Sequence, residues 1–200
     1  MVSLDRYDFS FTASSLRLSE MRLVASHQLN GTTIDCVNEL GNGNSATGKR
    51  MFAEFKKRLA TLSDREIQLL VESDLTSQKQ IAFLSVCKAH PFIRDFVVEV
   101  LREKLLIFDD ELTDGEYISF YRRKNEVHPE MDSLTMITQK KVRQVTLKIL
   151  EQAGIIDDIN LKQIQPQIIS EKVVQAIAFQ DRQWLKIFFM SDLDIENTVL

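Results

Sequence analysis

Hydrophobic side chains recur every three to four residues along most of this chain, the spacing of amphipathic α-helices. Residues 46–62 are the clearest case, because small or apolar side chains collect there on one helical face: Gly48, Met51, Phe52, Phe55, Leu59 and Leu62. A second amphipathic segment, residues 33–40, precedes this one, and the turn Gly41-Asn42-Gly43-Asn44 separates the two. Two helices joined by a short glycine-containing turn predict a helix-turn-helix.

The same spacing predicts helices further along the chain. Residues 63–66 read Ser-Asp-Arg-Glu, a capping box that opens a short helix. Pro91 suits the first position of a long apolar helix. We place a domain boundary near residue 75, which gives an N-terminal helix-turn-helix domain over residues 1–75 and a helical domain over residues 76–200.

The stretch from residue 138 to residue 158 predicts another helix, which Gly154 ends. Two short apolar segments follow, Ile155-Ile156 and residues 164–169. A helix followed by two such segments predicts a winged helix whose wing is a small β-hairpin, although β-branched segments also occur as core loops. The predicted fold class is therefore mainly α: a helical bundle with an N-terminal helix-turn-helix and a winged-helix element in the C-terminal half.

Composition supports an ordinary globular protein. The chain has 200 residues, six Gly, three Pro and a formal net charge of −4. This acidity argues against a protein that coats nucleic acid over its whole surface, but not against local basic patches. The two cysteines, Cys36 and Cys87, lie in apolar patterns and indicate free thiols in a reducing compartment. No secretion signal or membrane-spanning run is visible, so we expect a cytoplasmic protein.

Basic residues gather on two of the predicted helices. On the first they lie opposite the apolar face, on either side of Ala46 and Ala53. Small side chains at the centre of such a face allow close approach to a groove, and the cations meet phosphates or base edges. A merely solvated helix face is the alternative. The candidate DNA-binding residues are Lys49, Arg50, Lys56 and Lys57 on the first helix, and Lys140, Lys141 and Arg143 on the second.

Other chemistry is predicted to be absent. Residues 43–49 match the G-x-x-x-x-G-K phosphate loop of nucleotide hydrolases, but Arg50 stands where magnesium needs a hydroxyl. The segment before the loop is also a helical pattern and not a β-strand. The three histidines are scattered, and no metal site or catalytic set can be assembled from spacing. We therefore expect neither a cofactor nor a metal, and no enzymatic activity.

Four stretches together resemble a known family. They begin at residues 7, 46, 90 and 138 and read YDFSFTASSLRLSEMRLVA, ATGKRMFAEFKKRLATLSDREIQLL, HPFIRDFVVEVLREKL and TQKKVRQVTLKILEQAGIIDD. In order and spacing they are similar to the BrxA family of the bacteriophage-exclusion (BREX) phage-defence systems. The resemblance implies a small helical protein without enzymatic activity that binds double-stranded DNA beside the other BREX proteins, among them a methyltransferase, an ATPase and a phosphatase-like protein.

Two alternatives to DNA binding stay open. The resemblance extends to a small RNA-binding antitermination factor, which keeps RNA as a ligand. In the other alternative the protein is an interaction adaptor, whose basic faces dock on acidic surfaces of partner subunits. The overall acidity and the apolar segment WLKIFFM near the C-terminus favour that adaptor. The oligomeric state does not follow from the sequence.

Overall fold

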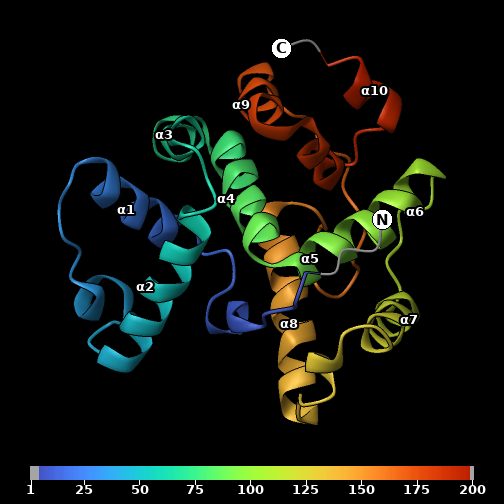
Figure 1. Ribbon diagram of the computed structural model, residues 1–200, viewed down its shortest axis with the longest axis horizontal. Coiled ribbons are helices and arrows are strands. Elements are labelled where there is room, and N and C mark those ends of the chain that lie inside the picture. Colours follow the sequence, from blue (N-terminus) through green and yellow to red (C-terminus); the bar gives the residue numbers. More distant parts are fainter. Residues whose placement is uncertain (1–4, 199–200) are drawn as a thin grey trace.

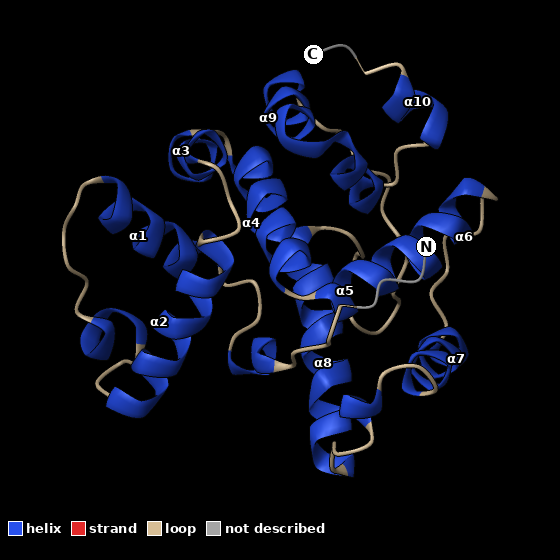
Figure 2. Ribbon diagram, in the orientation of Figure 1, coloured by secondary structure: helices blue, strands red, loops and turns tan. Residues whose placement is uncertain are grey.

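A computed structural model describes residues 5–198, so the first four residues of the N-terminal domain predicted above and the last two of the chain lie outside the described part. The mainly helical class is confirmed (Figures 1 and 2). The helices are α1 (Leu18–Leu29), α2 (Ser45–Leu59), α3 (Asp64–Glu72), α4 (Leu75–Ala89), α5 (Pro91–Phe96), α6 (Glu103–Leu106), α7 (Asp114–Asn125), α8 (Met136–Ala153), α9 (Glu171–Asp181) and α10 (Asp192–Glu196).

Helix α4 lies at the centre of the molecule (Figure 1). Most of its side chains are buried, and it contacts α1, α2, α3, α5, α8 and α9. Pro91 opens α5 at the first turn, where its missing N–H has no intrahelical acceptor. The chain then continues through wider π-helical turns, Val97–Arg102, into α6. These central helices supply the apolar surface on which the others pack.

The segment before α1 packs on the body of the protein as an arm. Tyr7 and Phe11 are buried, and residues Ser10–Ala13 form a single 3-10 turn. The Tyr7 hydroxyl donates to Oδ2 of Asp95 at 2.7 Å, and its ring stacks on His128 with 3.6 Å between centroids. Burial and the hydrogen bond to Asp95 raise the pKa of Tyr7 far above its ordinary value. The arm therefore connects α5 with the loop after α7.

The predicted β-hairpin wing is wrong. No β-strand occurs within residues 5–198 (Figure 2), and the two apolar segments meet only in one isolated bridge, between Ile156 and Ile164. The backbone N–H of Ile164 donates instead to the carbonyl of Asp110, in the acidic connection before α7. Ile155, Ile156 and Ile164 are each about 1% exposed, so the two segments pack on the core through these residues, whereas Ile168 further along is 87% exposed.

The predicted helix-turn-helix is also wrong in its first helix. Only Cys36–Leu40 is helical there, as a single π-helical turn. Asp35 caps the start of this turn, because its carboxylate accepts from the backbone N–H groups of Val37 and Asn38. The β-branched residues 32–34 also disfavour helix. The second helix, α2, is observed at Ser45–Leu59. The domain boundary near residue 75 stays a prediction.

Candidate nucleic-acid interface

Helix α2 lies directly on the π-helical turn before it. Its first turn is capped by Asn44, whose side-chain oxygen accepts from the backbone N–H of Thr47 at 2.9 Å. Gly48 faces the turn so closely that a Cβ there would lie 1.9 Å from the carbonyl oxygen of Cys36. The second glycine of the G-x-x-x-x-G-K match is therefore needed for backbone packing, and this packing orients the basic face outward.

Three of the predicted cations on α2 are free to meet a ligand. Lys49, Arg50 and Lys56 are exposed, as are Ala46 and Ala53 between them. Within residues 5–198 none of the three cations takes part in an ion pair. The Lys56 ammonium lies 5.7 Å from the centroid of the Phe52 ring, against the side of the helix. The outer face of α2 is thus a basic surface with small side chains at its centre.

Lys57 differs from these three. It is half-buried and forms an ion pair with Asp8 of the arm. Burial alone would raise the pKa of Asp8, but hydrogen bonds from Lys57 and from the backbone of Ser10 lower it below its ordinary value. Asp8 therefore stays ionised and neutralises Lys57, which joins α2 to the arm.

The last cation of the run, Arg58, faces the interior. Its side chain is fully buried, and it donates to Oε1 of Glu54 at 2.8 Å and to the carbonyls of Ser14 and Ser15 at 2.6 and 2.8 Å. His90 Nε2 lies 2.5 Å from the same Glu54 oxygen. Counting basic residues along the sequence did not show that Arg58 is buried. The i,i+4 spacing of Glu54 and Arg58 was the signal that could have indicated their ion pair.

This buried cluster has a defined ionisation. Burial raises the pKa of Glu54, but the hydrogen bond with His90 and the charge of Arg58 outweigh burial and hold it at about 2. Burial lowers the pKa of His90, and its bond to Glu54 only partly opposes this. We therefore assign a neutral His90 that donates from Nε2 to an ionised Glu54, whose charge Arg58 balances.

Helix α8 presents a second basic surface. Lys140 and Lys141 are exposed, and neither forms an ion pair in the described part of the chain. Arg143 instead turns toward α7, where its Nη2 lies 2.5 Å from Asp114 and its guanidinium covers the ring of Tyr117. Hydrogen bonds from Lys162 and Arg143 hold the pKa of Asp114 at about 2. Arg143 is therefore already bound to Asp114, which it shares with Lys162.

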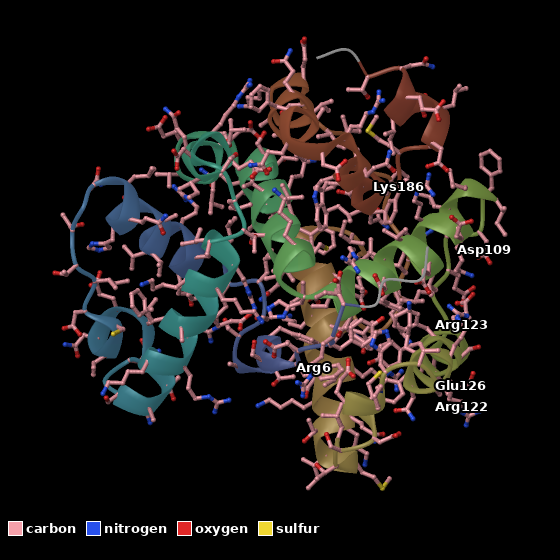
Figure 3. All side chains as sticks on the ribbon, in the orientation of Figure 1. Arg6, Asp109, Arg122, Arg123, Glu126 and Lys186 are labelled. Atoms are coloured by element: carbon pink, nitrogen blue, oxygen red, sulfur yellow. The ribbon has the colours of Figure 1, made fainter. Side chains whose placement is uncertain are left out.

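The arm lies between the two basic helices. Its turn, Ser10–Ala13, contacts both α2 and α8. In the view of Figure 3, Arg6 lies against α8, and it is exposed. Sequence reasoning gave Arg6 no role, because an isolated surface arginine carries no positional signal.

Among the residues that the structure describes, no group of three or more His, Cys, Asp or Glu is arranged to hold a metal ion. Across the same residues, no helix has the length and apolar character needed to cross a membrane. Cys36 and Cys87 are free thiols, and burial raises the pKa of Cys87 far above its ordinary range.

Fold and surface together define a mainly helical protein with two exposed basic helix faces. The family model for BrxA matches residues 5–181, and the chain belongs to the BrxA family. It is 25% identical to the BREX protein BrxA of Escherichia coli over 68% of this chain, and 27% identical to that of Bacillus cereus over 64%. These matches span about two thirds of the relatives, 65% of each.

A longer match supports the same assignment, and a solved structure has the same fold. The BREX protein BrxA of Paramagnetospirillum magneticum is 23% identical over 90% of this chain and 94% of its own length. The crystal structure of an uncharacterized protein from Magnetospirillum magneticum superposes with a TM-score of 0.79 at 21% identity. This superposition covers 93% of this chain and 99% of that protein, and it shows that the two share a fold.

Proposed function

We propose that this protein, a BrxA-family member of a BREX phage-defence system, binds double-stranded DNA and has no enzymatic activity. One observation carries the proposal. Cations that have no acidic partner among residues 5–198 lie exposed on two helices, on either side of the packed arm: Lys49, Arg50 and Lys56 on α2, and Lys140 and Lys141 on α8. In a chain with a net charge of −4, this concentration of unpaired positive charge supports an anionic ligand.

Phosphate contact would supply most of the affinity. Lysine and arginine on a helix neutralise backbone phosphates, while Ala46 and Ala53 leave room for the helix to approach the duplex. Lys57 and Arg143 would first have to leave Asp8 and Asp114, so we expect smaller contributions from them. The proposed site therefore binds duplex DNA with little sequence preference, in the cytoplasm and alongside other BREX proteins.

A salt titration tests this proposal. Affinity for a duplex is measured by fluorescence anisotropy at increasing salt concentration, with single-stranded RNA and duplex RNA as parallel ligands. A protein that makes several phosphate contacts loses orders of magnitude in affinity between roughly 50 and 200 mM salt. Duplex DNA should bind more tightly than either RNA. Absence of binding to duplex DNA even at low salt would reject the proposal, and tighter binding to RNA would replace it with the antitermination-like function.

The adaptor is the second candidate, and one observation favours it. Several large apolar side chains are exposed, including Phe108 at 96% and Ile137 at 81%. Exposed apolar groups that adjoin one another mark sites of protein contact, and Phe108 follows Ile107 at 73% exposure while Ile137 follows Met136 at 74%. The adaptor predicts no affinity for DNA near physiological salt, so the same titration separates the two candidates.

A further inference from the structure

Three buried polar groups on α7 and α8 lack a partner. They are the hydroxyls of Tyr117 and Tyr121 and Nε of Arg143, and none of them has a hydrogen-bond partner among residues 5–198. Tyr117 is only 5% exposed. Burial raises the pKa of both phenols, so each keeps its proton and can donate a hydrogen bond. Because an unpaired buried donor costs stability, these groups indicate a ligand that supplies acceptors.

All three residues line one groove between α7 and the first half of α8. Its volume is about 630 Å³, within the roughly 300–1,000 Å³ that is typical of sites for small ligands. Tyr121 is half-buried and Ile118 is 43% exposed, and these two side chains give the groove an apolar wall. The groove therefore combines an apolar wall with unpaired hydrogen-bond donors.

The charged lining of the groove has both signs. Arg122 and Lys140 are exposed and form no ion pair in the described part of the chain. Glu126 is also exposed and has no ion-pair partner among the same residues. A ligand that satisfies both signs carries a negative group for the two cations and a hydrogen-bond donor for the carboxylate.

Two amide side chains supply further acceptors. Asn125 donates from Nδ2 to Oδ1 of Asp132 at 2.9 Å, and Gln139 donates from Nε2 to the carbonyl of Leu134 at 2.9 Å. These bonds use the amide nitrogens and leave the two amide oxygens as acceptors at the groove. A nucleotide matches this set, because its base has a flat face and an edge with donors and acceptors, and its phosphate is negative.

A second hollow adjoins the groove. Its volume is about 390 Å³, and it shares Lys140 and Arg143 with the groove. Gln144, Leu147 and Ile159 complete its lining. Two hollows that share the same two cations suit consecutive units of a polymer better than one small molecule. This arrangement favours a nucleic-acid strand over a free nucleotide.

We propose that the α7–α8 groove receives one unpaired nucleotide of a DNA strand that crosses α8. The inference rests on the DNA binding proposed above and adds the feature of the DNA that this site recognises. The base lies against Tyr121 and Ile118, and Glu126 accepts from its exocyclic amine. The phosphate meets Arg122 and Lys140, so Lys140 keeps its role as a phosphate contact. Such a nucleotide occurs at a bulge, a mismatch or a strand end.

Fluorescence anisotropy with three duplexes of matched sequence tests the inference. The first is fully paired, the second has one bulged deoxycytidine, and the third has an abasic residue at the bulge. The second and third duplexes carry the same phosphates, so their difference in affinity measures the contribution of the base alone. The wild-type protein should bind the deoxycytidine bulge about tenfold more tightly than the abasic bulge, as one stacked base would give.

Hydroxyl and wall variants locate the site. Tyr117→Phe removes a hydroxyl that has no partner among residues 5–198, so the melting temperature should stay the same or rise. Its preference for the base should nevertheless fall by about fivefold, the effect of one lost hydrogen bond. Ile118→Ser should also reduce the preference. Ile137→Ser is the matched control, because Ile137 is an 81% exposed isoleucine on α8 outside the groove, and it should keep the full preference.

The outcomes separate this inference from the proposed function. Equal affinity of the wild type for the two bulged duplexes would overturn the inference and leave duplex binding in place. Absence of binding to all three duplexes would overturn both. Loss of the preference in Ile137→Ser as large as in Ile118→Ser would show that the groove is not the site. Free deoxycytidine monophosphate should compete only weakly; competition as strong as that of the bulged duplex would replace the strand with a free nucleotide.

Discussion

Arg58 donates from Nε to Oε1 of Glu54, one helical turn earlier on α2, at 2.8 Å, and neither side chain reaches solvent. The pair separates the cations of α2 into two sets. Lys49, Arg50 and Lys56 face outward, whereas Arg58 binds the carbonyls of the arm. One helix therefore offers a basic surface and also anchors the segment that lies between the two basic helices.

Removing Glu54 should cost much more stability than removing an exposed side chain. Glu54→Ala leaves Arg58 buried without its countercharge, so the free energy of unfolding should fall by about 3–5 kcal/mol. Lys49→Ala, at an exposed position on the same helix, should change it by about 0.5 kcal/mol or less. Urea denaturation measures both. Equal losses in the two variants would contradict a buried charge pair between Glu54 and Arg58.

Acid should destabilise the protein in two steps. Because the folded pKa of His90 is depressed, the unfolded chain binds more protons below the ordinary histidine value of 6.5, and stability is lost as the pH falls from there. Ionised Glu54 stabilises the folded state fully above its ordinary pKa of 4.5. This stability is lost as the pH falls toward its folded pKa of about 2.

The first of these steps can be isolated by mutation. His90→Gln removes the titrating imidazole, so the melting temperature should change less with pH between pH 6.5 and 4.5 than it does in the wild type. Thermal melts followed by circular dichroism over that range measure the difference. The same dependence in both proteins would rule out His90 as the source of this step.

Gly48 should be intolerant of even one added methyl group. A Cβ there meets the backbone of Cys36, which cannot move aside as a side chain can, so Gly48→Ala should lower stability by more than 1 kcal/mol, roughly the range of overpacked sites. Gly115 on α7 has only the Thr113 hydroxyl nearby, at 3.8 Å. Gly115→Ala should therefore be neutral or stabilising by up to about 1 kcal/mol. Chemical denaturation compares the two, and equal effects would contradict close packing at Gly48.

Charge reversal on α2 and charge reversal on α8 should each weaken DNA binding independently. Lys49→Glu with Lys56→Glu, and Lys140→Glu with Lys141→Glu, should each reduce affinity for a duplex without lowering the melting temperature, since all four residues are exposed. Each lost phosphate contact should reduce the slope of log affinity against log salt by about 0.9. Combining both pairs should abolish retention in a gel shift. Arg65→Glu, exposed on α3, is the control; a loss as large as that of either pair would indicate a non-specific charge effect.

Patterns of neighbouring residues correctly predicted the helix caps, which neighbouring residues determine. The capping box of Ser63 with Glu66 and the left-handed Gly154 at the end of α8 are observed, because each depends on residues within one helical turn. The wing was predicted wrongly because apolar segments look alike in a hairpin and in a core loop. Ile164 pairs with Asp110, more than fifty positions away, and no local pattern contains that partner.

The sequence by itself determined the helical class, the apolar face of α2 and the family, because periodicity, caps and motif order are properties of the linear chain. Only the tertiary structure decided which cations are available. Arg58 is buried with Glu54, Lys57 and Arg143 are bound to Asp8 and Asp114, and Lys56 remains exposed. The reason is physical: a charge is free or neutralised according to what packs against it, and these acids come from the arm, the core and another helix.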